Sequence, residues 1–234
     1  MFASIINHDD EDTTYTEIEQ EDIYDGEENY IRLSLQKNTD NPLVSIINKM
    51  EKNNEALGNI CVVNIGMRTG ADKVSQSYID KYLIDLPKNS GIFILTEKEK
   101  KALNLNETEL DLLLPWFKNS DIQKYTSKQK NELWLIDLSY PAHENLDQAK
   151  YPNIYKHILQ YRSILEGRRS NDNGLQAVLQ KGYWWAFTMR QLDFGGEKIV
   201  APQRSKFNCF GYNNIPWYAS MDVYYITNPN KDYH

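Results

Sequence analysis

The stretch ICVVNIGMRTGADKV, residues 60–74, joins an apolar run to a loop that holds two glycines, an arginine, a threonine, an aspartate and a lysine. The run at residues 60–65 is rich in β-branched residues and is typical of a strand. Gly66 and Gly70 predict a tight turn after it, because glycine adopts backbone conformations that other residues rarely reach. The loop therefore concentrates several hydrogen-bond donors directly after a strand.

Working outward from this loop, apolar patterns alternate with turn residues along most of the chain. The clearest helix is YPNIYKHILQYRSILEGRRS, residues 151–170, which Pro152 opens and Gly167 closes. Asn106 and Glu109 form a capping-box pattern at the start of a second helix, and Pro115 is expected to end it. This mixture indicates an α+β domain with a mixed, largely antiparallel sheet and packed helices. Further strands are predicted at residues 91–95, 132–139, 183–190, 197–202 and 221–227.

The charge distribution divides the chain near residue 30. Residues 1–30 carry eleven acidic side chains and no Lys or Arg, whereas the remaining residues carry 26 basic and 22 acidic side chains. Residues 151–215 hold nine basic and four acidic side chains. The acidic segment has too few apolar residues to bury a core, so we interpret it as a linker or the end of a larger unit. A basic binding face with an acidic tail is one interpretation of this asymmetry, and scattered surface charge is the other.

Composition argues against several classes of protein and site. No apolar run reaches membrane-spanning length, and the acidic start does not match a cleavable signal peptide. Cys61 and Cys209 lie far apart, and we interpret them as buried thiols of a cytoplasmic protein. None of the four histidines has a second ligand at metal spacing, and His157 is interpreted as a solvated helical residue. We therefore expect neither a disulfide framework nor a metal site.

Sequence signatures of catalysis are also missing. The chain contains no Gly-rich dinucleotide motif after a strand, no phosphate-cradling Gly-Lys-Ser/Thr loop and no serine in a nucleophile elbow. We therefore expect a binding module that holds no cofactor and has no enzymatic activity by itself.

Candidate binding residues are basic and hydroxyl side chains in predicted loops and at helix ends. Such side chains supply the donors that phosphates require, and arginine also reads guanine through two parallel hydrogen bonds. The alternative for each is a solvated surface charge. The candidates for binding DNA are Arg68, Thr69, Lys73, Lys118, Ser120, Lys124, Arg168, Arg169, Arg190, Arg204, Ser205 and Lys206.

Eight segments occur in one order along the chain: VNIGMRTGADKV, GIFILTEKE, LPWFKNSDIQKY, LWLIDLS, YPNIYKHILQYRSILEGRR, YWWAFTMR, KIVAPQRSKFNCF and DVYYIT. Together they resemble the TaqI-like C-terminal specificity domain, the target recognition domain of adenine-specific DNA methyltransferases and fused restriction-modification enzymes. The resemblance covers roughly residues 31–228. It implies the fold of a DNA methylase specificity domain, with residues 31–234 as the recognition domain and residues 1–30 as the linker or tail of a catalytic domain.

The resemblance also implies a division of labour. In the family, a catalytic domain carries S-adenosylmethionine and an Asn-Pro-Pro-Tyr-type loop for the flipped adenine, and the specificity domain reads double-stranded DNA. This chain has no Asn-Pro-Pro-Tyr or Asp-Pro-Pro-Tyr sequence. We therefore expect either a C-terminal fragment of a larger enzyme, with or without a fused endonuclease, or a detached specificity subunit that acts mainly through contact with a separate methyltransferase. A glycan-binding domain is a third class, which the 16 tyrosines and 5 tryptophans leave open.

Two interpretations of the glycine-containing loop remain. In the first, Arg68, Thr69 and Lys73 point donors at a DNA strand, and Asp72 braces the turn. In the second, the loop stabilises the fold, with Thr69 and Asp72 hydrogen-bonded inward and only Lys73 exposed.

Overall fold

The computed structural model divides the chain into two compact units, Met1–Asn59 and Ile60–His234. In the first unit, strands β1 (Tyr24–Asp25) and β2 (Tyr30–Ile31) pair antiparallel. The predicted domain boundary between residues 30 and 31 stays a prediction, and every candidate residue for binding DNA belongs to the second unit. The structure describes residues 57–168, 173–188 and 194–227, with Tyr24–Asp25, Tyr30–Ile31, Ile46, Lys49–Met50 and Glu55 before them.

The larger sheet of the second unit has six strands in the order β3-β14-β11-β12-β7-β6. Adjacent strands of this sheet pair antiparallel, except β12 and β7, which run parallel. The strands predicted around residues 60–65, 197–202 and 221–227 are confirmed as its three adjacent members β3, β11 and β14. The six strands are β3 (Val62–Ile65), β6 (Ile122–Gln123), β7 (Tyr125–Ser127), β11 (Lys198–Pro202), β12 (Gly211–Asn213) and β14 (Val223–Thr227).

A second sheet has four strands in the order β13-β5-β8-β4. Strand β8 pairs antiparallel with β4 and β5, and β13 pairs parallel with β5. A short parallel pair, β9 (Ser139–Tyr140) with β10 (Phe187–Thr188), stands apart from both sheets. The α+β fold with mixed, largely antiparallel pairing is therefore confirmed. The four strands are β4 (Ile94–Thr96), β5 (Leu113–Phe117), β8 (Leu133–Ile136) and β13 (Tyr218–Ala219).

The helix predicted from Asn106 to Pro115 is much shorter than expected. Its capping box is present, but α6 covers only Glu107–Leu110, and Pro115 lies inside strand β5. On β5, only Trp116 and Phe117 pair with β13. The absence of a backbone N–H on Pro115 therefore removes no hydrogen bond between β5 and β13. The apolar run that looked helical is a strand because burial between neighbouring strands outweighs local helix propensity.

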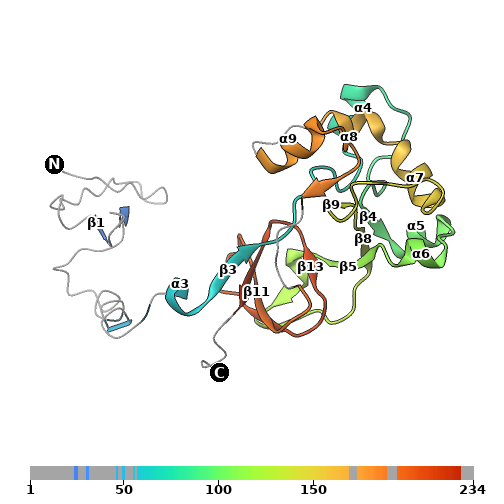
Figure 1. Ribbon diagram of the computed structural model, residues 1–234. Coiled ribbons are helices and arrows are strands. Elements are labelled where there is room, and N and C mark those ends of the chain that lie inside the picture. Colours follow the sequence, from blue (N-terminus) through green and yellow to red (C-terminus); the bar gives the residue numbers. More distant parts are fainter. Residues whose placement is uncertain are drawn as a thin grey trace, which may run out of the picture. The chain divides into compact units, whose positions relative to one another are not determined.

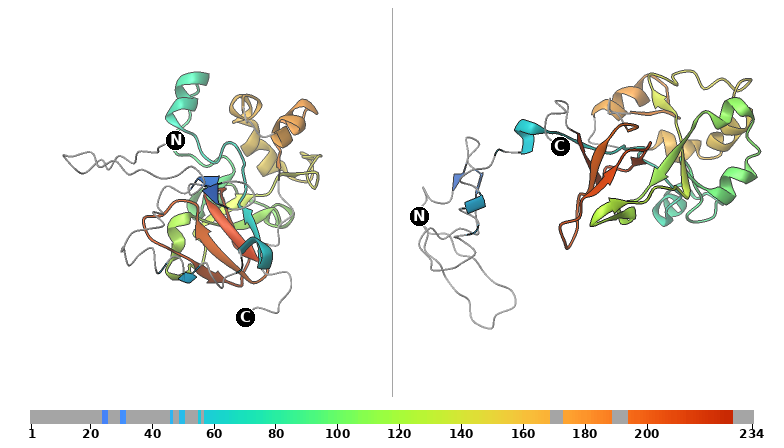
Figure 2. Two further views of the ribbon diagram at one scale, coloured as in Figure 1. Left: turned by 90° about the vertical axis from the view of Figure 1, so that its left-hand side faces the viewer. Right: turned by 90° about the horizontal axis from the view of Figure 1, so that it is seen from below.

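The helices gather beside the four-stranded sheet. Figure 1 and Figure 2 show α4, α7, α8 and α9 on one side of the unit and the six-stranded sheet on the other. The predicted helix at residues 151–170 is two helices, α7 and α8, separated by a turn at Gln160–Tyr161. In the described part of the chain, no helix has the length and apolar character to span a membrane. The remaining helices are α3 (Leu57–Ile60), α4 (Gln76–Tyr82), α5 (Glu97–Ala102), α7 (Pro152–Leu159), α8 (Arg162–Glu166) and α9 (Asn173–Gln180), and a short η1 covers Asn119–Asp121.

His157 lies in the core, so its interpretation as a solvated residue is wrong. Its side chain is 7% exposed, and Nε2 lies 2.9 Å from the carbonyl oxygen of Ile92. Burial lowers the pKa of His157 below its ordinary value, which favours the neutral ring. The helix face that it shares with Ile154 and Ile158 is therefore wholly internal.

Aromatic packing fills the core between the sheets. The rings of Phe117 and Trp217 stack with centroids 4.8 Å apart, and Tyr225 donates a 3.0 Å hydrogen bond to the carbonyl oxygen of Trp217. Phe93 meets Phe187 edge to face at 5.2 Å. These contacts bring both sheets into one hydrophobic cluster and support the loops that carry the candidate residues.

Candidate nucleic-acid interface

The loop after β3 is fastened to the end of β13 and to the start of β14. Gly66 donates to the carbonyl of Val223 at 2.9 Å, and Met67 donates to that of Ala219 at 2.9 Å. A Cβ atom on Gly66 would lie 2.2 Å from the carbonyl oxygen of Ser220, so glycine is required for this close approach. Gly70 has φ +76°, a conformation that favours glycine.

Thr69 and Asp72 hold the loop from within, as the second interpretation of this segment expects, but Lys73 is half-buried where that interpretation expects it to be exposed. The Thr69 side chain is 1% exposed and its hydroxyl donates to Asp72 Oδ1, while the backbone carbonyl of Asp72 accepts from Ile92 at 2.9 Å. Burial raises the pKa of Asp72, and the Thr69 hydrogen bond opposes that rise. The prediction that Thr69 donates to DNA is corrected, because its hydroxyl is buried and already donating.

Arg168 is also internal, which corrects its prediction as a surface contact at a helix end. The side chain is 5% exposed, and burial lowers its pKa to about 10, so the guanidinium stays charged at neutral pH. Nε donates to the carbonyl of Leu165 at 3.0 Å, and Nη1 to that of Thr69 at 2.7 Å. Nη2 donates to the carbonyls of Trp184 and Ala186 at 2.7 and 2.8 Å. The residue therefore joins three chain segments instead of reaching outward.

Arg68 and Lys73 lie at the rim of a surface pocket of about 510 Å³. Both are half-buried, and Arg68 Nε donates to the sulfur of Met221 at 3.1 Å. Asp72 and Asp222 line the same pocket, so carboxylates accompany the two basic residues. This mixed charge makes the pocket a weaker phosphate site than the sequence predicted.

Two other predicted segments lie side by side although about 80 residues separate them. Parallel pairing of β12 with β7 sets Gly211 opposite Tyr125, and the Tyr125 N–H donates to the Phe210 carbonyl at 2.7 Å. A Cβ atom on Gly211 would lie 2.5 Å from the Thr126 carbonyl oxygen, so this approach also requires glycine. We call residues 118–125 together with 203–210 the paired-segment surface.

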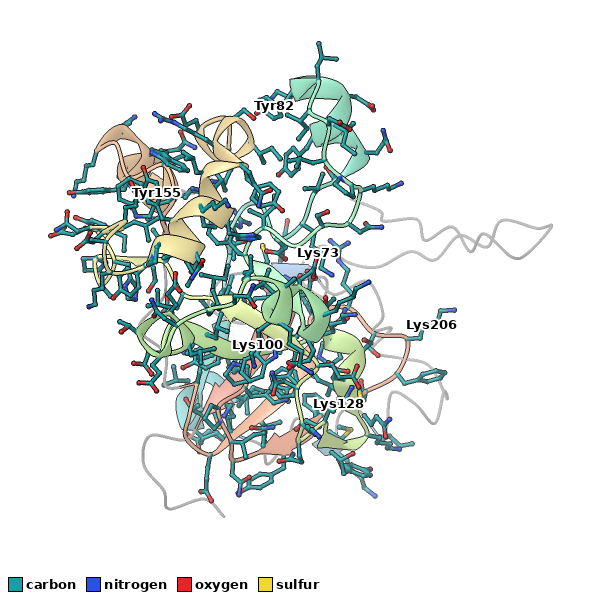
Figure 3. All side chains as sticks on the ribbon, turned by 90° about the vertical axis from the view of Figure 1, so that its right-hand side faces the viewer. Lys73, Tyr82, Lys100, Lys128, Tyr155 and Lys206 are labelled. Atoms are coloured by element: carbon teal, nitrogen blue, oxygen red, sulfur yellow. The ribbon has the colours of Figure 1, made fainter. Side chains whose placement is uncertain are left out.

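All six predicted residues of the paired-segment surface are exposed. Figure 3 shows Lys206 at an edge of the molecule, with its side chain directed away from the ribbon. The surface also surrounds a pocket of about 570 Å³, which residues of both segments line. The six predicted residues are Lys118, Ser120, Lys124, Arg204, Ser205 and Lys206.

Sequence reasoning missed two aromatic residues on the paired-segment surface. Phe207 is 81% exposed, and Tyr125 is 74% exposed at a backbone φ of 73°. The ammonium of Lys124 lies 5.4 Å from the centroid of the Tyr125 ring. The signal available in the sequence was an aromatic residue directly after a lysine in each polar segment, Lys124–Tyr125 and Lys206–Phe207.

The structure does not test the two remaining candidates for binding DNA. Arg169 and Arg190 lie outside the described residues.

Trp184 and Trp185 are half-buried and pack against the core, with Arg162 5.1 Å from the ring centroid of Trp184. Cys61 and Cys209 are free thiols. Across the residues that the structure describes, no three His, Cys, Asp or Glu side chains gather as a metal site.

Similarity to known proteins is found among solved structures. No protein-family model matches the chain, and no curated protein matches it. The fold is similar to part of the Type IIL restriction-modification enzyme MmeI, whose structure was solved in complex with DNA. The two chains are 13% identical, with a TM-score of 0.45 over 73% of this chain. This chain spans 20% of the length of that enzyme.

Proposed function

We propose that the chain is a recognition module that binds double-stranded DNA sequence-specifically, for an adenine-specific DNA methyltransferase or a fused restriction-modification enzyme. The observation that carries the proposal is the paired-segment surface. Two distant segments, each predicted to contact DNA, form one exposed surface there. The ordered set of motifs that resembles TaqI-like specificity domains supports the same proposal.

The charge of the paired-segment surface suits a polyanion. Its segment 118–125 holds Lys118, Lys124 and one aspartate, and its segment 203–210 holds Arg204 and Lys206 with no acidic residue. The aspartate, Asp121, accepts from the backbone N–H of Lys118 at 2.8 Å and lies 3.9 Å from Lys128 Nζ. Its charge is therefore engaged with neighbouring groups of the protein, and the exposed side chains of the surface present a net positive charge to a ligand.

Within this surface we assign different tasks to lysine and arginine. Lys118, Lys124 and Lys206 are point charges that suit phosphates, and contacts of this kind position a protein on any DNA sequence. Arg204 carries a planar fork that matches the paired major-groove acceptors of guanine. The loop at residues 66–74 supports the fold, with Arg68 and Lys73 as contacts at its edge.

In this proposal the chemistry belongs to a catalytic domain in the same or a separate chain. That domain would supply S-adenosylmethionine binding and methyl transfer, and this chain would supply the choice of DNA site. Contact with a separate methyltransferase is the competing function, and it predicts little affinity of this chain for DNA alone.

Salt dependence of DNA binding tests the proposal. Fluorescence anisotropy with a mixed-sequence duplex should show affinity that falls steeply with salt, because phosphate contacts release counterions at a slope of about −0.9 per contact. Lys124→Ala should weaken binding and lower the slope, whereas Lys156→Ala, an exposed lysine on α7, should not. Absent or salt-independent binding would favour the protein-contact function.

A further inference from the structure

The pocket within the paired-segment surface is of a size that small ligands occupy. Its volume of about 570 Å³ lies within the range of about 300–1,000 Å³ that ligand sites occupy. We propose that this pocket binds a nucleobase that is unstacked from DNA, with the base against the ring of Phe207. The inference rests on the proposed function, because it requires DNA at this surface. Its lining residues are Gln123, Lys124, Ser205, Phe207, Asn208 and Cys209.

Phe207 provides the reason to expect a stacked ligand. Its side chain is 81% exposed, although it is large and apolar. A nucleobase would cover the ring of Phe207, and stacking of this kind tolerates any base because every base has a π-face. Gln123 and Asn208 add carboxamides to the same pocket, and Ser205 adds a hydroxyl. These groups can donate to and accept from the edge of a base.

The backbone holds the two walls of the pocket close together. Cys209 Sγ donates to the carbonyl of Ile122 at 3.5 Å, which fastens one wall to the other. The hydrogen bond from Tyr125 to Phe210 and the close approach at Gly211 fix the next positions along both segments. Phe207 itself is oriented at its backbone, where its N–H donates to Ser205 Oγ at 3.3 Å. The pocket therefore exists before any ligand arrives, which lowers the ordering cost of binding.

Charge identifies a nucleic-acid strand as the source of the base, and the proposed function makes that strand DNA. Lys124 lines the pocket, and Arg204 and Lys206 are exposed on the segment that contributes Ser205 and Phe207. A base that enters the pocket brings its 5′ and 3′ phosphates toward these cations. A neutral aromatic ligand or an apolar peptide would leave them unused, so the combination of ring and cations favours a nucleotide within a strand.

The test compares a fully paired duplex with a duplex that carries one additional, unpaired adenine in one strand and is otherwise identical in sequence. The whole chain is titrated against each by fluorescence anisotropy at low salt. We expect tighter binding of the duplex with the unpaired adenine by about 5- to 150-fold, the range that one stacked base gives. The readout is the ratio of the two dissociation constants, which cancels any general change in DNA affinity.

Variants test whether the ratio of the two dissociation constants depends on the pocket. Phe207→Ala should bring the ratio close to one, and Phe207→Trp should restore it, since tryptophan also offers a stacking face. Tyr212→Ala is the matched control, because Tyr212 is 51% exposed on β12 and does not line the pocket, and its ratio should match that of the unchanged chain. Thermal unfolding verifies that each variant is folded.

The outcomes separate the two proposals. Equal binding of both duplexes by the unchanged chain overturns the nucleobase site and leaves DNA recognition standing. A ratio that survives in a folded Phe207→Ala variant likewise places the base elsewhere. Failure to bind either duplex overturns the proposed function and the inference together.

Discussion

The guanidinium of Arg168 donates a 2.7 Å hydrogen bond from Nη1 to the carbonyl oxygen of Thr69. Both residues looked like DNA contacts in the sequence, and both are buried. Their contact links the loop after β3 to the end of α8, so these two residues maintain the fold.

Arg168→Ala should lower the free energy of unfolding by at least about 3 kcal/mol, because each buried acceptor left without a donor costs about 1–3 kcal/mol. Four backbone carbonyls lose the Arg168 donor. Urea unfolding measures the loss, and Arg162→Ala, an exposed arginine on α8, is the control. A folded, equally stable Arg168→Ala variant with weakened DNA binding would show instead that Arg168 contacts DNA.

Glu109 predicts a dependence of stability on pH. Its carboxylate is fully buried and accepts from the backbone N–H groups of Asn106, Asn153 and Ile154 at 3.0, 2.6 and 2.9 Å, and from Asn153 Nδ2 at 2.9 Å. Burial alone would raise the pKa of Glu109, but these hydrogen bonds hold it below its ordinary value of 4.5. The folded state therefore holds this proton less tightly than the unfolded state. The resulting stabilisation is present above pH 4.5 and is lost as the pH falls through the folded-state pKa.

Glu109→Gln should cost about 1–3 kcal/mol at pH 7, since an amide NH₂ would face donors in place of a carboxylate oxygen. It should also reduce the loss of stability on acidification. The measurement is urea unfolding at pH 7 and pH 4, with the exposed Glu107→Gln on the same helix as the control. Equal pH dependence in the variant and the unchanged chain would show that another group titrates.

Gly66→Ala should destabilise the second unit by about 1–3 kcal/mol, the usual cost of overpacking. The added Cβ would lie 2.2 Å from the Ser220 carbonyl oxygen, so the backbone must shift. Gly58→Ala is the control, because a Cβ there would meet no atom within 4 Å apart from its chain neighbours and its own helix. Thermal unfolding compares the variants, and similar melting temperatures would contradict the required close approach.

Arg204 and Lys118 should differ in what they contribute to the proposed DNA binding. Arg204→Ala should relax specificity at one base position by about 1–3 kcal/mol, whereas Lys118→Ala should weaken all sequences alike and lower the salt slope by about one. Binding across a panel of sites with single-base substitutions distinguishes them. A uniform loss with Arg204→Ala would make it a phosphate contact.

Removal of residues 1–30 should tighten non-specific DNA binding, because eleven acidic side chains would no longer repel phosphates or compete for the basic surface. Anisotropy titrations at low salt compare the shortened and complete chains. If the shortened chain bound DNA with equal or weaker affinity, the acidic segment would not oppose DNA binding.

Local chemistry in the sequence was enough to predict the secondary structure in several places. The strands near residues 60–65, 197–202 and 221–227 follow from short β-rich runs between turn residues. The capping box of Asn106 and Glu109 involves residues three positions apart, so nearby sequence decides it. These features together determine the α+β class.

Only tertiary packing decided which polar side chains face outward. The sequence predicted that Arg168 and His157 lie at a surface. Instead, backbone carbonyls of distant segments surround the Arg168 guanidinium. The ring of His157 forms a hydrogen bond with the backbone carbonyl of Ile92. The pairing of β12 with β7 likewise brought residues 203–210 to residues 118–125. The physical reason is that helix caps and strand patterns depend on neighbours along the chain, whereas burial and pocket formation depend on contacts between segments far apart in sequence.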